Sequence, residues 1–380
     1  MKITLSVIKA DIGSVGGHAK PSRQVFETVT NFITTKGKGL LLDFRTFHTG
    51  DDIAILMSHQ RGSVDEKIHK LAWDAFLAGT KVAKEQGLYG AGQDLLVEAF
   101  SGNVRGMGPA VVELEFEERP SEPFILFMAD KTDPGAFNLP FFLTFADPFH
   151  NAGLILAPDM AKGFTFDVMD VSYTEADRVI RLHAPEDYYK IATLLRDPET
   201  YVIESIFLRD SGEQAAAIST SRLHNIAGKY TGKDDPVALV RIQKQFPDAG
   251  ELVSPYALIP FVAGDNRGSH HTPMMPVKLF TSISYWDGPC IVSGAAINVQ
   301  KGKFTDPHDV FEHPFWDYIR DRASEKFLEL RRQGFFGPAM VGMNELEYTG
   351  VVDQLKELDK LFKVRDSKTL PKRPSQSSEK

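Results

Sequence analysis

Runs of apolar residues divide the N-terminal third of the chain into strands and helices. Continuous or alternating apolar residues predict strands at residues 3–8, 40–47, 53–57, 111–117 and 124–129. A helix is predicted over residues 22–36, with Ser22 as its N-cap and Gly37 at its end. A second helix is predicted to open on the capping-box pattern Ser63-Val64-Asp65-Glu66 and to stop before Gly87. This order of elements is typical of an α/β protein.

The rest of the chain contains more strand-like segments than helices. Further strands are predicted around Phe141, Leu154, Phe164 and Val202, and over residues 237–242, 277–285 and 290–299. Helices are predicted over residues 185–195, 309–332 and 344–361. The stretch 367–380 lacks apolar periodicity and is predicted to be disordered. We therefore expect one continuous α/β domain over residues 1–366, with mixed sheets inside and helices outside.

The charge balance of the chain is mildly acidic. Its 380 residues include 51 acidic and 43 basic side chains, a net charge of −8, whereas proteins that bind nucleic acid normally carry excess basic charge. The single cysteine, Cys290, excludes an intramolecular disulfide and a multi-thiolate metal site. No stretch approaches the roughly 20 apolar residues that span a bilayer. We expect a cytoplasmic protein that binds neither nucleic acid nor membranes.

Aspartates recur at predicted strand ends and turns, namely at Asp11, Asp51, Asp52, Asp130, Asp234 and Asp235. Mg²⁺ prefers oxygen ligands, and carboxylates gathered without cations would repel one another. His18 could join Asp11 across a glycine-rich loop, and Gln93 could add a neutral oxygen ligand. Aspartate is also a common turn former and helix cap, which is the alternative for each position. The absence of HExxH, paired CxxC and EF-hand spacings argues against zinc peptidases and calcium sensors.

Glycine-rich segments could bind phosphate, and one lysine could attack a carbonyl. Residues 102–106 have the composition of a phosphate-binding loop, although such loops are often only tight connections. Residues 228–233 do not complete a Walker motif, and residues 90–95 do not complete a dinucleotide fingerprint, which argues against ATPase and Rossmann functions.

The segment Tyr230-Thr231-Gly232-Lys233-Asp234-Asp235 combines a phenol, an amine and two carboxylates, which could serve proton transfer, nucleophilic attack and metal binding. The alternative is a polar surface turn. The two carboxylates favour the ammonium form of Lys233, which is not nucleophilic, and bound Mg²⁺ would offset their field.

Five segments together resemble one known family. They are residues 11–18, 48–52, 89–94, 130–135 and 230–236, and they follow the family's order and spacing along all of the chain except its tail. The family is that of fructose 1,6-bisphosphate aldolase/phosphatase, also called class V fructose-1,6-bisphosphatase. The resemblance implies a gluconeogenic enzyme that joins dihydroxyacetone phosphate to glyceraldehyde 3-phosphate and then hydrolyses the C1 phosphate, leaving fructose 6-phosphate. It also implies several Mg²⁺ ions, a homo-octamer, and an α-β-β-α sandwich with two central sheets.

The resemblance also implies roles for individual residues. Lys233 would form a Schiff base with dihydroxyacetone phosphate, and Tyr230 would move a proton during carbon–carbon bond formation. The implied metal ligands are Asp11, His18, Asp51, Asp52, Gln93, Asp130, Asp234 and Asp235. The implied substrate contacts are His18, Tyr89, Gly102, Asn103, Lys131, Gln243, Arg267, Asp287 and Tyr348. The alternatives are a Mg²⁺-dependent sugar phosphatase without aldolase activity and a non-catalytic sugar-phosphate sensor.

Overall fold

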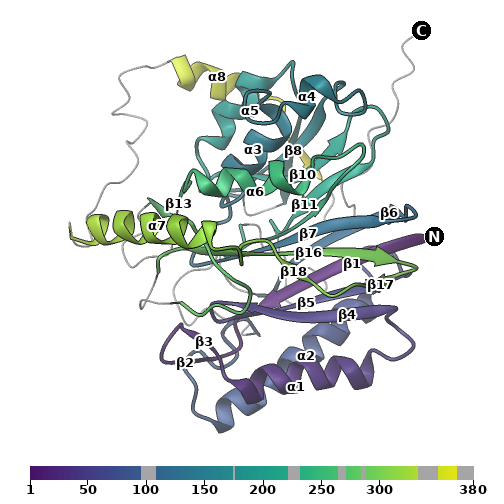
Figure 1. Ribbon diagram of the computed structural model, residues 1–380, viewed down its shortest axis with the longest axis vertical. Coiled ribbons are helices and arrows are strands. Elements are labelled where there is room, and N and C mark those ends of the chain that lie inside the picture. The colour runs from purple at the N-terminus through teal and green to yellow at the C-terminus, as the bar shows by residue number, and fades with distance from the viewer. Residues whose placement is uncertain are drawn as a thin grey trace.

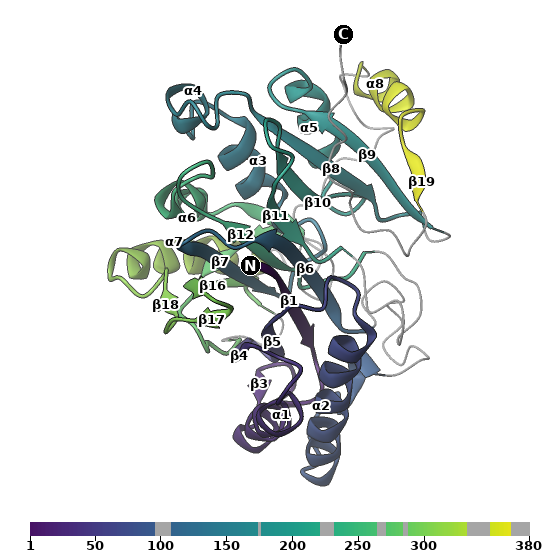
Figure 2. The same ribbon diagram turned by 90° about the vertical axis from the view of Figure 1, so that its right-hand side faces the viewer.

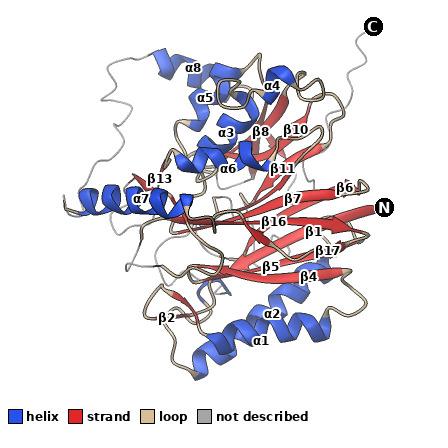
Figure 3. Ribbon diagram, viewed as in Figure 1, coloured by secondary structure: helices blue, strands red, loops and turns tan. Residues whose placement is uncertain are grey.

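Two β-sheets lie face to face in the centre of the molecule, and helices cover the outer face of each sheet (Figure 1). The structure is a computed structural model that describes residues 1–95, 108–173, 176–220, 232–263, 271–283, 288–332 and 350–365. Figure 3 shows the layers by type, with helices outside the stacked strands. The predicted α-β-β-α sandwich is therefore confirmed.

The smaller sheet comes from the first third of the chain. Its strands, in spatial order, are β4 (Asp43–Thr49), β5 (Asp52–His59), β1 (Lys2–Ala10) and β6 (Ala110–Glu117). All three pairings are antiparallel. Helices α1 (Arg23–Lys36) and α2 (Glu66–Glu85) lie on its outer face, as the turned view in Figure 2 shows. Ser22 caps α1 as predicted, because its hydroxyl accepts a hydrogen bond from the backbone N–H of Val25.

The larger sheet contains eleven strands among the described residues. Its main path, in spatial order, is β15 (Met275–Pro276), β16 (Ile291–Gln300), β7 (Glu122–Asp130), β12 (Val237–Arg241), β11 (Gln214–Ile218), β10 (Tyr201–Leu208), β8 (Phe164–Asp170), β9 (Asp177–His183) and β19 (Lys363–Arg365). Two more strands pair with β16, namely β17 (Lys303–Phe304) and β18 (His308–Asp309). The pairing of β15 with β16 is parallel, which makes this sheet mixed.

Helices and short strands complete the described part of the fold. The remaining α-helices are α3 (Asn138–Ala146), α4 (Gly153–Leu156), α5 (Tyr188–Leu195), α6 (Ala249–Ala257), α7 (Phe315–Arg331) and α8 (Gly350–Asp359). Two small ribbons pair β2 (Ser14–Val15) with β3 (Lys20–Pro21) and β13 (Phe261–Ala263) with β14 (His271–Pro273). Within the described ranges, each helix is too short or too polar to cross a membrane.

Three apolar layers hold the sandwich together. Val7 of β1 points toward the larger sheet and belongs to the same buried cluster as Leu126 of β7. The next residue, Ile8, points the other way and packs with α1 and α2, because successive side chains of a strand face opposite sides. On the far side of the larger sheet, Phe127 lies against Phe141 of α3, with ring centroids 6.4 Å apart. Strands buried on both faces therefore separate the layers.

Several predicted elements were wrong. Phe141 and Leu154 lie in α3 and α4 rather than in strands, because a short apolar run has no periodicity that separates a strand from a buried helix. Residues 277–283 are irregular, and Phe280 has a positive φ of 64° that interrupts an extended run. Strand β9 was not predicted, because four of its seven residues are polar.

Two helix starts also differ from the prediction. The N-cap of α2 is Asp65 rather than Ser63, because the Asp65 carboxylate accepts the backbone N–H groups of Lys67 and Ile68. Helix α7 begins at Phe315 and not near residue 309, since residues 308–309 form β18. Residues 284–285, 344–349 and 367–380 of the predicted segments lie outside the described residues.

One end of the two sheets gathers the segments that carry the predicted aspartates. β1 and β5 are antiparallel, so Ala10 at the end of β1 lies opposite Ile53 at the start of β5. β7 and β12 are also antiparallel, so the end of β7 lies opposite the start of β12. The turn between β4 and β5 reaches across to the larger sheet at Gly50, where a Cβ would lie 1.4 Å from Oδ2 of Asp130. The ends of β1 and β7 therefore meet the starts of β5 and β12.

We expect Leu126→Ala to lower the free energy of unfolding by about 2–5 kcal/mol, because it would leave a cavity between the two sheets. Leu77→Ala, on the exposed side of α2, is the control and should change it by less than about 1 kcal/mol. Chemical denaturation of both variants measures the difference. Equal losses in the two variants would contradict a close-packed layer at Leu126.

Candidate active site

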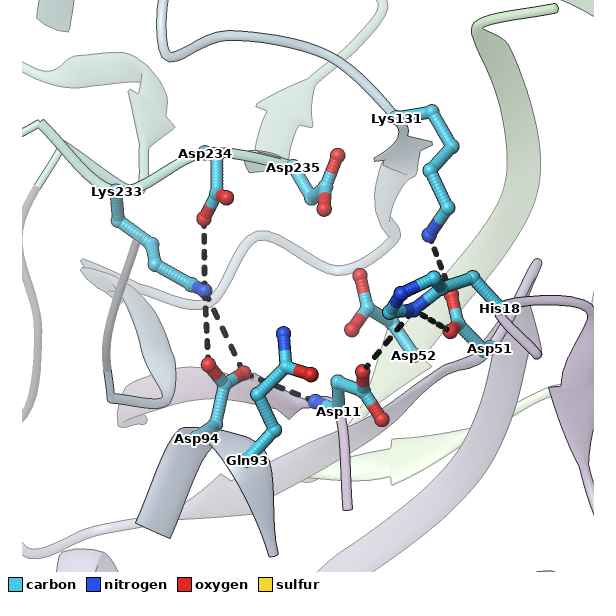
Figure 4. Close-up of a pocket in the computed structure, with 10 residues that line it drawn as sticks. All are labelled: Asp11, His18, Asp51, Asp52, Gln93, Asp94, Lys131, Lys233, Asp234 and Asp235. Atoms are coloured by element: carbon cyan, nitrogen blue, oxygen red, sulfur yellow. Dashed lines mark hydrogen bonds and ion pairs between the residues drawn. The ribbon is translucent and has the colours of Figure 1, made fainter. Parts of the chain in front are cut away.

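A polar pocket lies where the strand ends meet (Figure 4). It comes from the loops after β1 and β7, the β4–β5 turn, the short 3-10 helix Gln93–Leu95, and the segment before β12. The lining residues of this acidic pocket are Asp11, His18, Asp51, Asp52, Gln93, Asp94, Lys131, Lys233, Asp234 and Asp235. Segments far apart in the sequence thus supply one concentrated set of carboxylates.

Asp11, His18 and Asp51 form the first cation group, with one possible ligand atom from each within 4.8 Å of the others. Nδ1 of His18 lies 3.2 Å from Oδ2 of Asp51 and 3.9 Å from Oδ2 of Asp11. The hydroxyl of Ser14 donates to Oδ2 of Asp51 at 2.9 Å, and the backbone N–H of Gly13 donates to Oδ1 of Asp11 at 3.0 Å. These bonds fix the carboxylates while leaving further oxygen lone pairs for a cation.

Asp52, Asp130 and Asp235 form the second cation group, again with possible ligand atoms within 4.8 Å of one another. Oδ2 of Asp130 accepts the backbone N–H of Asp51 at 3.2 Å, which ties the β4–β5 turn to the end of β7. Oδ1 of Asp235 accepts the backbone N–H of Thr132 at 2.7 Å. Backbone N–H groups of neighbouring segments therefore hold two of the three carboxylates.

Two lysines neutralise part of this charge. Nζ of Lys131 lies 2.6 Å from Oδ1 of Asp51 and 2.8 Å from Oδ1 of Asp130, so it bridges the two groups. Lys9 reaches in from β1, pairs with Asp52, and donates to the carbonyl of Ala129 at 3.2 Å. Burial alone would lower the pKa of Lys9, but the charges of Asp52 and other aspartates raise it.

Lys233 is the third buried ammonium of the pocket. Its Nζ lies 3.2 Å from Oδ1 of Asp94 and 2.8 Å from Oδ1 of Asp234, and the residue is only 5% exposed. Burial would lower the pKa of Lys233, but the charges of Asp234 and Asp94 outweigh burial and raise the pKa above its ordinary value. Lys233 is therefore an ammonium ion in this arrangement.

Burial and mutual repulsion also shift the carboxyl groups. Burial, together with the charges of neighbouring aspartates, raises the pKa of Asp94 and of Asp130 to about 7. The same causes raise the pKa of Asp11 and of Asp235 well above the usual value. Asp51 is different: burial opposes its ionisation, but Lys131 and His18 lower its pKa.

The donor set fits divalent cations. Seven carboxylates (those of the two groups together with Asp94 and Asp234) face three lysine ammonium groups, which leaves four negative charges uncompensated when all are ionised. Hard cations with oxygen ligands relieve this repulsion, whereas a site of thiolates or several imidazoles would suit softer metals. These residues could therefore hold more than one divalent cation.

Comparison with known proteins identifies the family of the chain. A family model described as fructose-1,6-bisphosphatase matches residues 2–363. The chain belongs to this family. It is 55% identical to the fructose-1,6-bisphosphate aldolase/phosphatase of Thermus thermophilus, over 95% of this chain and 100% of the relative. Proteins of the same name from Cenarchaeum symbiosum and Moorella thermoacetica are 48% and 44% identical, over 97% and 95% of this chain and 96% and 94% of the relatives.

The structure brings together the metal ligands that the fructose-1,6-bisphosphatase resemblance implied. Seven of them line the acidic pocket, and Asp130 belongs to the second cation group. Of the implied substrate contacts, His18 and Lys131 line the pocket, and Tyr89 meets the His18 ring edge-on with centroids 4.8 Å apart. Gln243 does not line the pocket and follows the far end of β12. The other implied residues lie outside the described ones: Gly102, Asn103, Tyr230, Arg267, Asp287 and Tyr348.

Two buried residues of this fructose-1,6-bisphosphatase site were not predicted from the sequence: one lines the pocket, and the other pairs with a lining residue. Asp94 is 3% exposed and contacts Lys233, and it directly follows Gln93, which was selected. Lys9 is 1% exposed, and its signal was a lysine that continues the strand predicted at residues 3–8. Such a lysine must be paired when the strand is buried on both faces.

Without divalent cations, the protein should lose stability as the pH rises. A carboxyl with a higher pKa in the folded chain gives stability that is complete below its unfolded pKa and is lost as pH rises through its folded pKa. For Asp94 and Asp130 this window runs from about 4 to about 7. We expect the free energy of unfolding in chelator to fall by at least about 1.4 kcal/mol from pH 5 to pH 8. Excess Mg²⁺ should reduce the fall; a level profile in chelator would contradict this.

Lys9→Met should lower the free energy of unfolding by about 3–5 kcal/mol in chelator, because it leaves buried carboxylates without their counter-charge. Lys2→Met is the matched control on the same strand, since Lys2 forms an exposed ion pair with Glu115, and it should cost less than about 1 kcal/mol. Denaturant-induced unfolding measures the free energy of unfolding of both variants. Similar stability in the two variants would show that Lys9 is not needed to balance the site.

Proposed function

We propose that this chain is a bifunctional gluconeogenic enzyme. It condenses dihydroxyacetone phosphate and glyceraldehyde 3-phosphate to fructose 1,6-bisphosphate, and it hydrolyses the C1 phosphate to give fructose 6-phosphate and phosphate. The observation that carries the proposal is the buried Lys233 at the edge of two groups of carboxylates. The relatives named aldolase/phosphatase support this proposal, because the similarity covers nearly all of this chain and of each relative.

In the condensation, Lys233 would attack the carbonyl of dihydroxyacetone phosphate and form a Schiff base, which acts as an electron sink for the carbanion. Tyr230 would move the proton during carbon–carbon bond formation. Lys233 is buried and lines the acidic pocket. A substrate bound to this lysine would therefore be sheltered from water, and the phosphate of the substrate would face the cation groups.

In the hydrolysis, the same carboxylates would hold several Mg²⁺ ions, with Asp11, His18, Asp51, Asp52, Gln93, Asp130, Asp234 and Asp235 as ligands. Bound Mg²⁺ would polarise the phosphate and lower the pKa of an attacking water. The oxygen-rich donor set and its uncompensated negative charge support this choice of metal. Lys131, which already bridges both groups, would contact the phosphate.

Further parts of the proposal concern the rest of the molecule. His18, Tyr89, Gly102, Asn103, Gln243, Arg267, Asp287 and Tyr348 would bind the sugar phosphates. A single catalytic domain would span residues 1–366, and eight copies would assemble in the cytoplasm without nucleic acid or a membrane. The family resemblance supports the octamer, and the mild acidity of the chain supports the lack of a nucleic-acid partner.

One observation favours a second candidate, a Mg²⁺-dependent sugar phosphatase without aldolase activity. Asp94 and Asp234 stabilise the ammonium form of Lys233, which suits a phosphate-binding residue and opposes nucleophilic attack. The two candidates differ in whether a covalent adduct forms on Lys233.

We expect Lys233→Ala to abolish fructose 6-phosphate formation from the two triose phosphates and to retain some release of phosphate from fructose 1,6-bisphosphate. Chelation of Mg²⁺ should abolish phosphate release in both the variant and the wild type. Enzyme-coupled assays of fructose 6-phosphate and phosphate follow both reactions. Lys360→Ala, in an exposed pair with Glu357, is the control and should keep both activities. Condensation by Lys233→Ala at the wild-type rate would overturn the Schiff-base mechanism.

A further inference from the structure

The two carboxylates beside Lys233 differ in their surroundings (Figure 4). The Asp234 side chain is 19% exposed, and Asp234 is among the residues proposed to bind metal. The Asp94 side chain is 4% exposed and approaches Nζ of Lys233 with both oxygens, at 3.2 and 3.4 Å. Asp94 belongs to neither of the two cation groups found among the described residues. If Asp234 bound a metal ion, Asp94 would remain paired with Nζ of Lys233.

Asp94 is fixed by a reciprocal pair of bonds to Asp11. The backbone N–H of Asp11 donates to Oδ2 of Asp94 at 2.9 Å, and the backbone N–H of Asp94 donates to the carbonyl of Asp11 at 3.1 Å. The preceding turn is tight, because a Cβ on Gly92 would lie 2.8 Å from Thr80. The carboxylate therefore has a defined position, and its charge is directed at Lys233.

We infer that Asp94 is the counterion of the protonated Schiff base at Lys233, an assignment that rests on the proposed aldolase function. Overall, the ammonium ion and the substrate carbonyl give an iminium ion and one water: a C=N bond replaces the C=O bond, and two protons of the ammonium leave with the oxygen. Nζ carries the positive charge before and after this overall change, although the amine that attacks the carbonyl is neutral. A carboxylate at Nζ therefore stabilises the protonated iminium relative to the neutral imine, and the iminium is the electron sink of the reaction.

This assignment gives Asp94 a role in only one of the two reactions. Hydrolysis of the C1 phosphate needs no iminium, so the charge of Asp94 should matter more for the condensation. A residue that merely shaped the pocket would affect both reactions to a similar extent. The ratio of the two activities therefore separates a counterion from a structural residue.

Asp94→Asn is the test, because the amide keeps the volume and an oxygen that can accept the Asp11 N–H but removes the charge. Borohydride reduction with dihydroxyacetone phosphate, followed by intact mass measurement, reports the adduct on Lys233. Because borohydride reduces the protonated iminium rather than the neutral imine, we expect the rate at which the adduct is trapped to fall roughly tenfold or more, as for loss of a hydrogen bond to a charged group, and phosphate release from fructose 1,6-bisphosphate to fall by a clearly smaller factor. Asp353→Asn, on the exposed side of α8, is the matched control.

The other outcomes overturn the inference. Equal falls in both rates would make Asp94 structural, and an unchanged adduct rate would remove it from the reaction. A loss of Mn²⁺ affinity in calorimetry, in proportion to the loss of adduct, would make it a metal ligand instead. If the Asn variant does not fold, Asp94→Glu displaces the same charge and should show the same selective loss. A wild-type protein that forms no adduct would refute the proposed aldolase function itself.

Discussion

The constraint on which this structure depends is the repulsion among buried carboxylates at one end of two packed sheets. Lys9, Lys131 and Lys233 each form ion pairs with these carboxylates, and backbone N–H groups hold several of their oxygens. Such a cluster would separate on a mobile loop. It persists because strand ends hold most of the contributing segments, and because the apolar layers between strands and helices are extensive.

The backbone around the pocket also departs from relaxed geometry. Lys131, which follows β7, has a positive φ of 63°, and Asp235, which lies just before β12, has a positive φ of 49°. Non-glycine residues adopt this conformation at a cost, and they persist where the surroundings determine it. Here the bond between the N–H of Thr132 and Asp235 joins the two segments. Local strain and electrostatic repulsion are therefore concentrated in the region that would meet the substrate.

Much of the fold follows from local patterns in the sequence. The apolar runs of β1, β5 and β7 and the cap at Ser22 were identified correctly, because each depends on neighbouring residues. The helix at Phe141 was not, since a buried helix and a buried strand can have the same apolar run. The aspartate ligands were predicted from their places at strand ends and from family motifs, whereas Asp94 and Lys9 acquire their roles from tertiary contacts that no spacing records.

The position of Lys131 links the occupancy of the two cation groups. One ammonium group pairs with Asp51 of the first group and Asp130 of the second. A divalent ion entering either group would compete with that ammonium, and displacement of Lys131 would remove a counter-charge from both groups. Occupancy of one group would therefore be coupled to occupancy of the other through a single side chain.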